Sequence, residues 1–217
     1  MPKKKIKILT MFDYYSNQYN RFFLEYFDVE LTNDPNEEGI TLALFTGGAD
    51  VNPDYYGEAM GVNTFINKQR DTLEEEMFNS LSNDILKVGI CRGSQFLTVM
   101  SGGKLIQHVT GHGQSHNIIT KDGVIMEVTS THHQMMYPFE MKKEEYEIIA
   151  HASSFLSDKY LNGENRSIDL PDNFEECEIV KYNKFNCICV QGHPEFGHAT
   201  KEFKNYVIQL IENELQK

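Results

Sequence analysis

The chain has few cysteines and few basic residues for its length, and each scarcity excludes a class of protein. It has 217 residues and four cysteines, too few to indicate a disulfide framework in an intracellular chain of this size. Its 20 basic residues are outnumbered by 32 acidic residues, so the net charge is −12. We do not expect such an acidic chain to bind nucleic acid directly, because that function needs a basic face.

Long apolar runs are also missing. The first apolar stretch, residues 6–12, follows the basic start Met1-Pro2-Lys3-Lys4-Lys5 and is interrupted by Lys7. It is too short for a secretory signal or a membrane span, so we expect a cytoplasmic protein with no membrane partner. No repeat, low-complexity tract or linker divides the sequence, and the length suits one domain covering residues 1–217.

Apolar runs and helical periodicity alternate through the first half of the chain, which predicts an α/β fold. Strands are predicted at residues 6–12, 40–46 and 85–88, and helices at 19–27, 70–83 and 94–100. The run at 40–46 is almost continuously apolar, as in a sheet that is covered on both faces. Later segments predict antiparallel strands near residues 118, 124–128 and 147–151, an inserted loop at 158–173, a hairpin at 178–182 and 186–191, and a terminal helix at 197–215.

One cysteine lies where an apolar run meets a predicted helix. Cys91 is the centre of Gly89-Ile90-Cys91-Arg92-Gly93, which has the spacing of a nucleophile elbow with cysteine in place of serine. The glycines allow a sharp turn beside the nucleophile, and the helix start favours the thiolate. The alternative interpretation is a buried cysteine at the end of a core strand.

A histidine and a glutamate follow a second apolar strand near the C-terminus. His193 and Glu195 lie two residues apart in Gly192-His193-Pro194-Glu195, so both side chains can project to the same side of an extended chain. A thiol nucleophile needs a base and a group that orients the base, and these two residues suit those roles. The alternatives are a surface histidine at a strand end and a carboxylate at a helix N-terminus.

The other cysteines and histidines do not predict a metal site. Cys187 and Cys189 alternate on one strand face, where packing is the ordinary role, and Cys177 adds only a weak zinc pattern. His112 and His116 lie in a segment with two glycines, which we interpret as a polar loop. The sequence therefore predicts neither a metal nor another cofactor.

Two motifs taken together resemble those of the class I glutamine amidotransferase family: Gly-x-Cys-x-Gly-x-Gln at residues 89–95 and His-Pro-Glu at 193–195. Further pieces resemble its gamma-glutamyl hydrolase and gamma-glutamyl-gamma-aminobutyrate hydrolase branch. In the family's order, these pieces are Gly-Gly-x-Asp-Val-x-Pro at 47–53, Tyr-Gly-Glu at 56–58, Arg-Asp-x-x-Glu at 70–74, Gly-Gly-x-Leu-x-Gln at 102–107 and His-His-Gln at 132–134.

The resemblance implies a three-layer, open and mostly parallel sheet of the flavodoxin-like kind, with helices on both faces and a small antiparallel edge or flap. It also implies hydrolysis of a γ-glutamyl amide. In that reaction Cys91 forms a glutamyl thioester, His193 transfers the proton and Glu195 orients His193. The backbone N–H of Arg92 follows the nucleophile and is the natural oxyanion donor; the resemblance suggests Gly48 as the second.

The resemblance further assigns Gln95, His132 and His133 to substrate binding. The alternatives are a helix-surface glutamine and buried structural histidines. The arginine side chain at position 92 could meet a substrate carboxylate or form a local salt bridge. One departure stands next to the base: the family commonly has an aromatic residue where this chain has Gly192, and we expect this change to open the floor of the pocket.

Three functions remain open at this point. The first is a monomeric or homodimeric hydrolase that acts alone on a small γ-glutamyl substrate. The second is a glutaminase subunit that passes ammonia to a separate synthetase. The third is a catalytically silent binding protein that keeps the pocket. The departure of residues 158–173 from the family's pattern leaves the identity of the substrate open.

Overall fold

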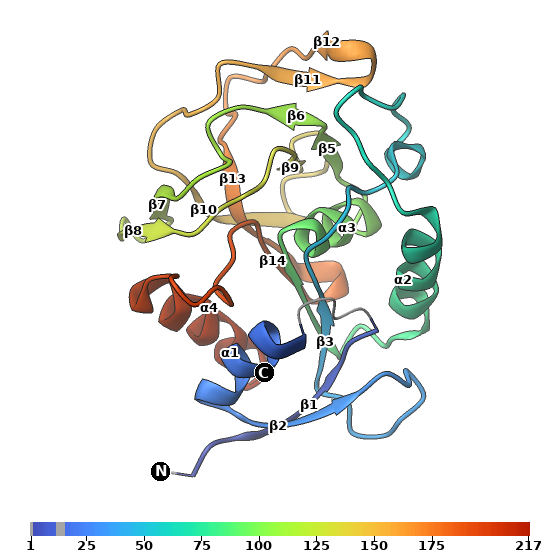
Figure 1. The fold of residues 1–217 in the computed structure, drawn as a ribbon, viewed down its shortest axis with the longest axis vertical. Helices are drawn as coiled ribbons and strands as arrows, with labels where there is room; N and C mark the ends of the chain where they lie inside the picture. Colours follow the sequence, from blue (N-terminus) through green and yellow to red (C-terminus); the bar gives the residue numbers. More distant parts are fainter. Residues whose placement is uncertain (1, 12–15) are drawn as a thin grey trace.

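A computed structural model describes residues 2–11 and 16–217, and its centre is a nine-stranded sheet (Figure 1). The strand order is β2-β1-β3-β4-β14-β13-β10-β7-β8. The strands from β2 to β14 run parallel, and the remaining pairs are antiparallel. These strands are β1 (Lys5–Leu9), β2 (Asp28–Thr32), β3 (Leu42–Phe45), β4 (Leu86–Ile90), β7 (His116–Thr120), β8 (Ile125–Val128), β10 (Tyr146–Ala152), β13 (Cys177–Tyr182) and β14 (Cys187–Val190).

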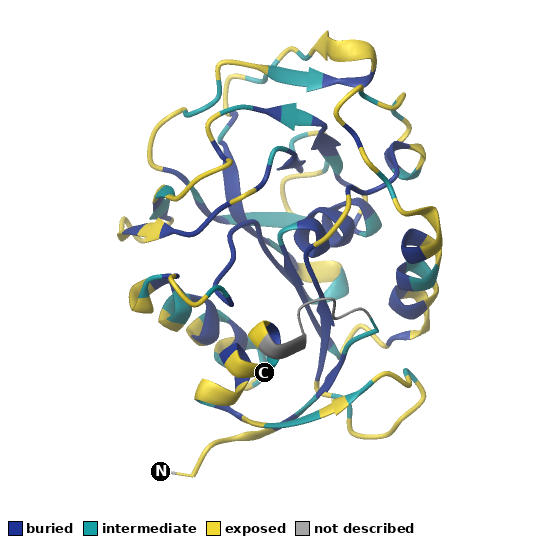
Figure 2. Ribbon diagram, viewed as in Figure 1, coloured by how far each residue is buried: buried dark blue, intermediate teal, exposed yellow. Residues whose placement is uncertain are grey.

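Helices cover both faces of this sheet, as predicted. Alternate residues of each strand point to opposite faces, so the sheet separates two apolar clusters. Ile8 of β1 packs in the cluster with Phe22 of α1 (Ser16–Tyr26) and Phe203 of α4 (Lys201–Glu214). Phe45 of β3 packs in the other cluster, with residues of α2 (Lys68–Ser80) and α3 (Arg92–Met100). Figure 2 shows the buried strands between the two helical layers.

A smaller layer of strands lies beyond the antiparallel half of the sheet, at the top of Figure 1. It consists of β6 (His108–Val109), β11 (Tyr160–Asn162) and β12 (Arg166–Ser167), beside the pair β5 (Lys104–Ile106) and β9 (Met135–Tyr137). Residues 158–173 therefore form a short hairpin and not only a loop. The described part of the chain also contains three single-turn helices: η1 (Pro53–Tyr56), η2 (Gly163–Asn165) and η3 (Asn183–Phe185).

The structure differs from the sequence predictions at several element boundaries. Strand β2 was not predicted, because it lies at the edge of the sheet and all five of its residues are partly or fully exposed. Strand β1 ends at Leu9, and Phe12 of the predicted strand lies outside the described residues. Helix α4 begins only at Lys201, where Thr200 accepts a hydrogen bond from the Phe203 N–H. No helix in the described parts of the chain is long and apolar enough to cross a membrane.

Candidate active site

Cys91 occupies the sharp turn between β4 and α3. Its backbone φ is +52°, in the region that favours glycine, so this residue is held in a strained conformation. The turn brings the first residues of α3 against β3, where a Cβ on Gly93 would collide with the carbonyl oxygen of Phe45. The turn is closed by the Cys91 carbonyl, which accepts a hydrogen bond from the Ser94 N–H at 3.0 Å. This geometry is that of a nucleophile elbow.

His193 lies just beyond the end of β14, the strand that pairs with β4. Its backbone N–H donates to the Thr129 carbonyl at 2.7 Å, and its ring stacks on Phe196 with the centroids 4.2 Å apart. Nδ1 is 2.7 Å from Oε1 of Glu195, and Nε2 is 2.9 Å from Oγ1 of Thr131. Glu195 is buried and lies well before α4, so its partner is the histidine ring and not a helix N-terminus.

The side chains of Cys91 and His193 meet beside Gly47. A Cβ placed on Gly47 would lie 3.4 Å from Cε1 of His193 and 3.8 Å from Cβ of Cys91. Burial lowers the pKa of His193, but the Cys91 sulfur and the Glu195 carboxylate raise it more, and the resulting pKa is about 10. The imidazole therefore holds its second proton at neutral pH.

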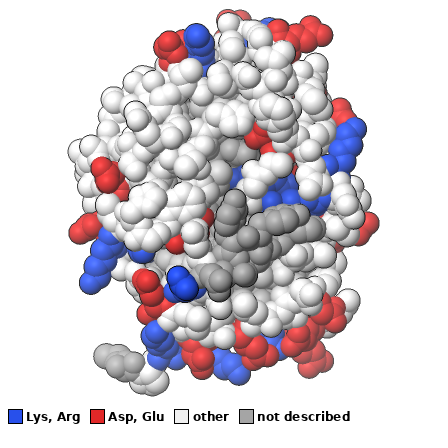
Figure 3. Space-filling view, viewed as in Figure 1, with Lys and Arg blue, Asp and Glu red and all other residues white. Residues whose placement is uncertain are grey.

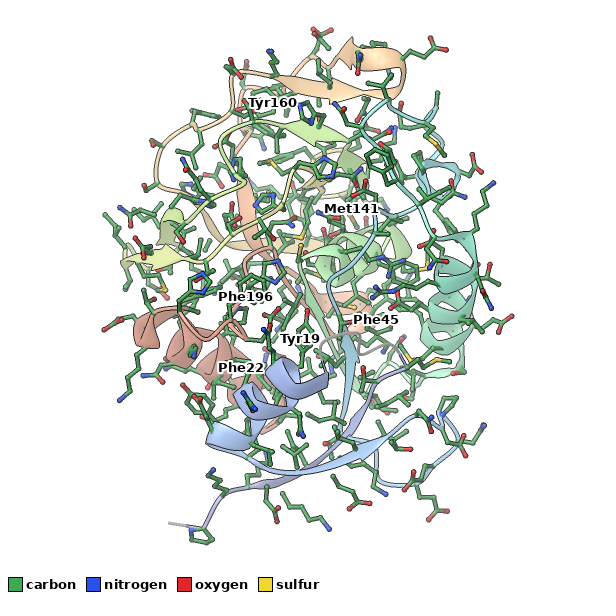
Figure 4. The ribbon with its side chains drawn as sticks, in the orientation of Figure 1. Tyr19, Phe22, Phe45, Met141, Tyr160 and Phe196 are labelled. Atoms are coloured by element: carbon green, nitrogen blue, oxygen red, sulfur yellow. The ribbon has the colours of Figure 1, made fainter. Side chains whose placement is uncertain are left out.

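Tyr19 is a site residue that the sequence did not indicate. It comes from α1, and Figure 4 labels it next to Phe196. Its buried hydroxyl accepts a hydrogen bond from the Gly47 N–H at 2.9 Å. Burial and the nearby Glu195 carboxylate raise the pKa of Tyr19, so the phenol stays neutral. No motif marks this residue, because an aromatic stripe on a helix is ordinarily core packing.

A buried ionic network holds the turn after β3. The Arg70 guanidinium donates from Nη1 to the Gly47 carbonyl and from Nη2 to the Thr46 carbonyl, each at 2.8 Å. Gly48 has a φ of +151°, and a Cβ there would collide with this guanidinium. Glu74 pairs with Arg70 at 3.0 Å. The Arg-Asp-x-x-Glu motif thus fixes the backbone on one side of the nucleophile.

The Arg92 side chain belongs to the same network. It is buried and pairs with Asp71 and Glu74, so the local salt bridge, and not a contact with substrate, is the role that the structure gives it. Its backbone N–H, like that of Gly48, donates to no acceptor among residues 2–11 and 16–217. Both N–H groups are therefore available to a ligand beside Cys91.

These residues surround one cavity of about 550 Å³. The lining residues are Gln18, Tyr19, Gly47, Gly48, Ala49, Asp50, Cys91, Arg92, Gln95, Thr131, His132, His133, Gln134, His193, Glu195 and Phe196. All eight residues that the sequence assigned to the site are among them. Gln95 is not a helix-surface residue, because it is buried and its Nε2 donates to the Gln134 carbonyl at 3.1 Å.

The two histidines of the His-His-Gln segment differ in their surroundings. His133 is partly exposed, and its Nε2 is 3.2 Å from Oδ1 of Asp50. His132 is buried, with Nδ1 2.9 Å from the Gln134 carbonyl oxygen and Nε2 3.3 Å from Oε1 of Glu178. Its ring nitrogens are therefore engaged within the wall, whereas the His133 side chain is 40% exposed.

Two sequence expectations about neighbouring residues were wrong. Gly192 does not open the cavity floor, because the Phe203 ring occupies that place; a Cβ on Gly192 would be 3.1 Å from Phe203 Cζ. The segment with His112 and His116 is not simply a polar loop. His112 is fully buried, and both rings contact Glu178 of β13.

Comparison with known proteins identifies the family. The model of the family described as Peptidase C26 matches residues 38–156, which is more than half of the chain. The chain belongs to the Peptidase C26 family. One relative, a candidate glutamine amidotransferase of Schizosaccharomyces pombe, is 33% identical over a 202-residue alignment that covers 80% of this chain and 70% of the relative.

Solved structures share the fold of this Peptidase C26 protein. One from Thermoplasma acidophilum, a candidate GMP synthase subunit, superposes with a TM-score of 0.65 at 12% identity, covering 100% of this chain and 96% of the other. PurLQS from Thermotoga maritima gives a TM-score of 0.57 at 15% identity, with 99% and 100% covered. These likenesses confirm the predicted class I glutamine amidotransferase-like fold.

Proposed function

We propose that this protein hydrolyses a γ-glutamyl amide bond through a glutamyl thioester on Cys91. The observation that supports this best is the His193–Glu195 pair, joined at 2.7 Å, beside a cysteine at an elbow in a cavity of about 550 Å³. A thiol, an imidazole and an orienting carboxylate in this order are the parts that acyl transfer requires. We also propose that residues 1–217 act as one domain and belong to the gamma-glutamyl hydrolase branch.

The reaction proceeds in two steps. The Cys91 thiolate attacks the γ-carbonyl carbon, and the His193 imidazolium donates its proton to the leaving nitrogen as the C–N bond breaks. Water then attacks the thioester carbonyl, His193 accepts its proton, and the sulfur leaves with glutamate released. The products are glutamate and ammonia or an amine. Glu195 keeps the imidazole in one orientation and stabilises its cationic form.

Backbone N–H groups stabilise the tetrahedral oxyanion. The N–H groups of Gly48 and Arg92 line the cavity beside Cys91 and have no acceptor within the described part of the chain. A donor of this kind is worth about 3 kcal/mol in the transition state. The ionic network of Arg70 holds the Gly48 turn in place, so the oxyanion site is already formed in the free protein.

The rest of the cavity binds the amino-acid end of the substrate. Gln95 and His133 line it, and we assign to them the α-amino and α-carboxylate groups of the glutamyl moiety. His132 contributes to substrate binding indirectly, because its ring stabilises the cavity wall through the Gln134 carbonyl and Glu178. Figure 3 shows acidic and basic side chains mostly around the edges of one face, and with a net charge of −12 this supports a small-molecule substrate over nucleic acid.

A glutaminase subunit is the second candidate, and one surface feature favours it. The loop beside the cavity exposes Val62 and Phe65, which are 67% and 73% exposed. This loop is tied to the cavity wall, because the Phe65 N–H donates to Oδ2 of Asp50 at 2.8 Å. Exposed apolar groups next to a site suit a docking partner, and one of the proteins with a similar fold is named for a subunit of GMP synthase.

A substrate screen decides between these functions. Glutamine and a set of γ-glutamyl amines are incubated with the wild type and with Cys91→Ala, and glutamate release is measured. Strong turnover of a γ-glutamyl amine by the protein alone, with poor use of glutamine, eliminates the glutaminase that needs a partner. Labelling of the wild type but not Cys91→Ala by a glutamine-like diazoketone eliminates the silent binding protein, whereas no labelling and no turnover would refute the hydrolase.

A further inference from the structure

Three histidines and two glutamates form a buried cluster behind the His132 wall of the cavity. They are far apart in the sequence and come from the loop before β7, from β7 itself, from the loop before β9 and from the region of β13. The members are His112, His116, His132, Glu176 and Glu178. The side chains of all five are at most 6% exposed, which is unusual for so many titratable groups.

One carboxylate oxygen is the meeting point of the three rings. Oε1 of Glu178 is 3.0 Å from Nδ1 of His112 and 2.9 Å from Nε2 of His116. It is also 3.3 Å from Nε2 of His132. The other oxygen, Oε2, is buried without a hydrogen-bond partner in the described chain. Three nitrogen atoms from three segments thus converge on one anionic group.

The remaining ring nitrogens face oxygens on the outside of the cluster. The three distances are 3.2 Å from His112 Nε2 to Glu176 Oε2, 3.0 Å from His116 Nδ1 to the Gln114 carbonyl and 2.9 Å from His132 Nδ1 to the Gln134 carbonyl. All six ring nitrogens therefore face an oxygen atom. A neutral imidazole has one N–H and one lone pair, so three lone pairs would oppose oxygens if all three rings were neutral.

Protons alone do not satisfy this arrangement. Protonating all three rings places three positive charges against the two carboxylates of Glu176 and Glu178, which leaves a surplus charge in a buried site. If fewer than three rings are protonated, at least one ring nitrogen points its lone pair at an oxygen atom, which is repulsive. A divalent cation removes both conflicts, because it balances the two carboxylates and accepts the inward lone pairs. The outward N–H groups of His116 and His132 then donate to the Gln114 and Gln134 carbonyls. Metal-binding histidines are held by outer acceptors in this manner.

We propose that His112, His132 and Glu178 bind a divalent transition-metal ion of the zinc class, with His116 as the fourth donor. The candidate donor atoms of the first three lie within 4.8 Å of one another. Tetrahedral zinc with bonds of about 2.0–2.1 Å places its donors roughly 3.3 Å apart, so small side-chain movements suffice. Nitrogen donors favour zinc or cobalt over magnesium or calcium.

The ion would act as a structural anchor for one wall of the cavity. The segment that carries His132 also carries Thr131, whose Oγ1 contacts His193, and Gln134, whose carbonyl accepts from Gln95. Four protein donors leave no open position for substrate, which is typical of structural zinc. This role requires no contact between the ion and the reacting atoms.

The test measures metal binding directly on the full chain. Protein purified without chelator is analysed for zinc by mass spectrometry, and metal-free protein is titrated with Co²⁺, whose visible absorption reports tetrahedral coordination. We expect one ion per chain. Glu178→Gln should abolish the Co²⁺ spectrum. Glu176→Gln keeps all four proposed donors but changes the carboxylate that faces His112, so it should weaken binding by about 10–100-fold.

Two control variants locate the ion. His198 is exposed and outside the cluster, so His198→Ala should bind Co²⁺ as the wild type does. Cys91→Ala should also retain the ion, because the thiol is not one of the five cluster members and lies across the cavity wall from them. Binding that survives Glu178→Gln but is lost in Cys91→Ala would place the metal at Cys91 and overturn the proposal.

Folding of the variants is checked by circular dichroism. If Glu178→Gln does not fold, the metal-binding test is made on His116→Gln instead. His116 is the most exposed of the three histidines, so its replacement should disturb the fold least. It should fold and bind Co²⁺ at least about tenfold more weakly, with a changed spectrum. Wild-type protein that carries no zinc and gives no tetrahedral Co²⁺ spectrum would overturn the proposal outright.

Discussion

At the scale of single residues, the thiol and the imidazole are placed by backbone contacts on two neighbouring strands. The positive φ of Cys91 forms the sharp turn after β4, and the hydrogen bond from the His193 N–H to the Thr129 carbonyl fixes the backbone just after β14. Because the two side chains act as one unit, removing either should abolish the chemistry to a similar extent. We expect Cys91→Ala and His193→Ala each to lower glutamate release by roughly ten-thousand-fold or more. Near-normal turnover by His193→Ala would show that another group is the base.

The pKa of His193 makes a prediction about stability. This pKa is raised from 6.5 to about 10 in the folded protein, so the cationic ring stabilises the native state fully below pH 6.5 and less as the pH rises toward 10. The excess stability of the wild type over His193→Gln should therefore shrink between about pH 6 and about pH 10. Urea unfolding at the two pH values measures it. An excess that is constant or grows with pH would contradict the proposed pairing with Cys91 and Glu195.

Tyr19 supports the site from a helix that carries no motif. Tyr19→Phe removes the acceptor of the Gly47 N–H but keeps the ring that packs in the core. The loss of one hydrogen bond costs about 0.5–1.5 kcal/mol of unfolding free energy. Because this bond holds Gly47 beside Cys91, we also expect kcat/KM to fall by roughly two- to tenfold. The control is Tyr26→Phe, about two turns further along α1, which removes a hydroxyl that donates to Asn205 and not to the cavity. Equal effects of the two changes on kcat/KM would exclude a role of the Tyr19 hydroxyl at the site.

At the scale of elements, α2 has a second function besides covering the sheet. Its buried Glu74 pairs with Arg70 and with Arg92, so it connects the turn after β3 to the start of α3. Glu74→Gln removes the one carboxylate that both buried guanidinium groups share among the described residues, which should cost about 3–5 kcal/mol of unfolding free energy. Glu76→Gln, an exposed position on the same helix, should change it by less than about 0.5 kcal/mol. Denaturant unfolding of both variants distinguishes a structural network from a surface effect.

The elements that the sequence predicted well are those with a strong local pattern. The continuously apolar β3, the mostly apolar β4 and the turn at Cys91 follow from runs and glycines that are adjacent in the sequence. Strand β2 lacks such an apolar run, because an edge strand buries little apolar surface. The filling of the Gly192 position by Phe203 depends on how α4 packs, and the meeting of His112 with Glu178 joins residues 66 positions apart. Such contacts are set by topology, which a local pattern does not contain.

At the scale of the whole molecule, the sheet divides into a parallel half that carries Cys91 and His193 and an antiparallel half that carries the Glu178 cluster. Strand β13 joins them, since it pairs with β14 on one side and with β10 on the other. The proposed metal and the proposed nucleophile thus lie on opposite sides of the same cavity wall. The motifs predicted the parallel half of this arrangement, and alternating segments predicted strands of the antiparallel half. The structure adds the buried cluster at Glu178.

The burial of each strand predicts how fast its backbone amides exchange with solvent. All residues of β4 and β14 are buried, whereas the outer strands β2 and β8 have exposed residues at alternating or irregular positions. Backbone groups in strands covered on both faces exchange only through large-scale unfolding. Hydrogen exchange followed by mass spectrometry should therefore find the slowest amides in β4 and β14 and faster exchange in β2 and β8. Protection of β8 equal to that of β4 would contradict this prediction and would mean that a second copy of the chain covers the antiparallel half in solution.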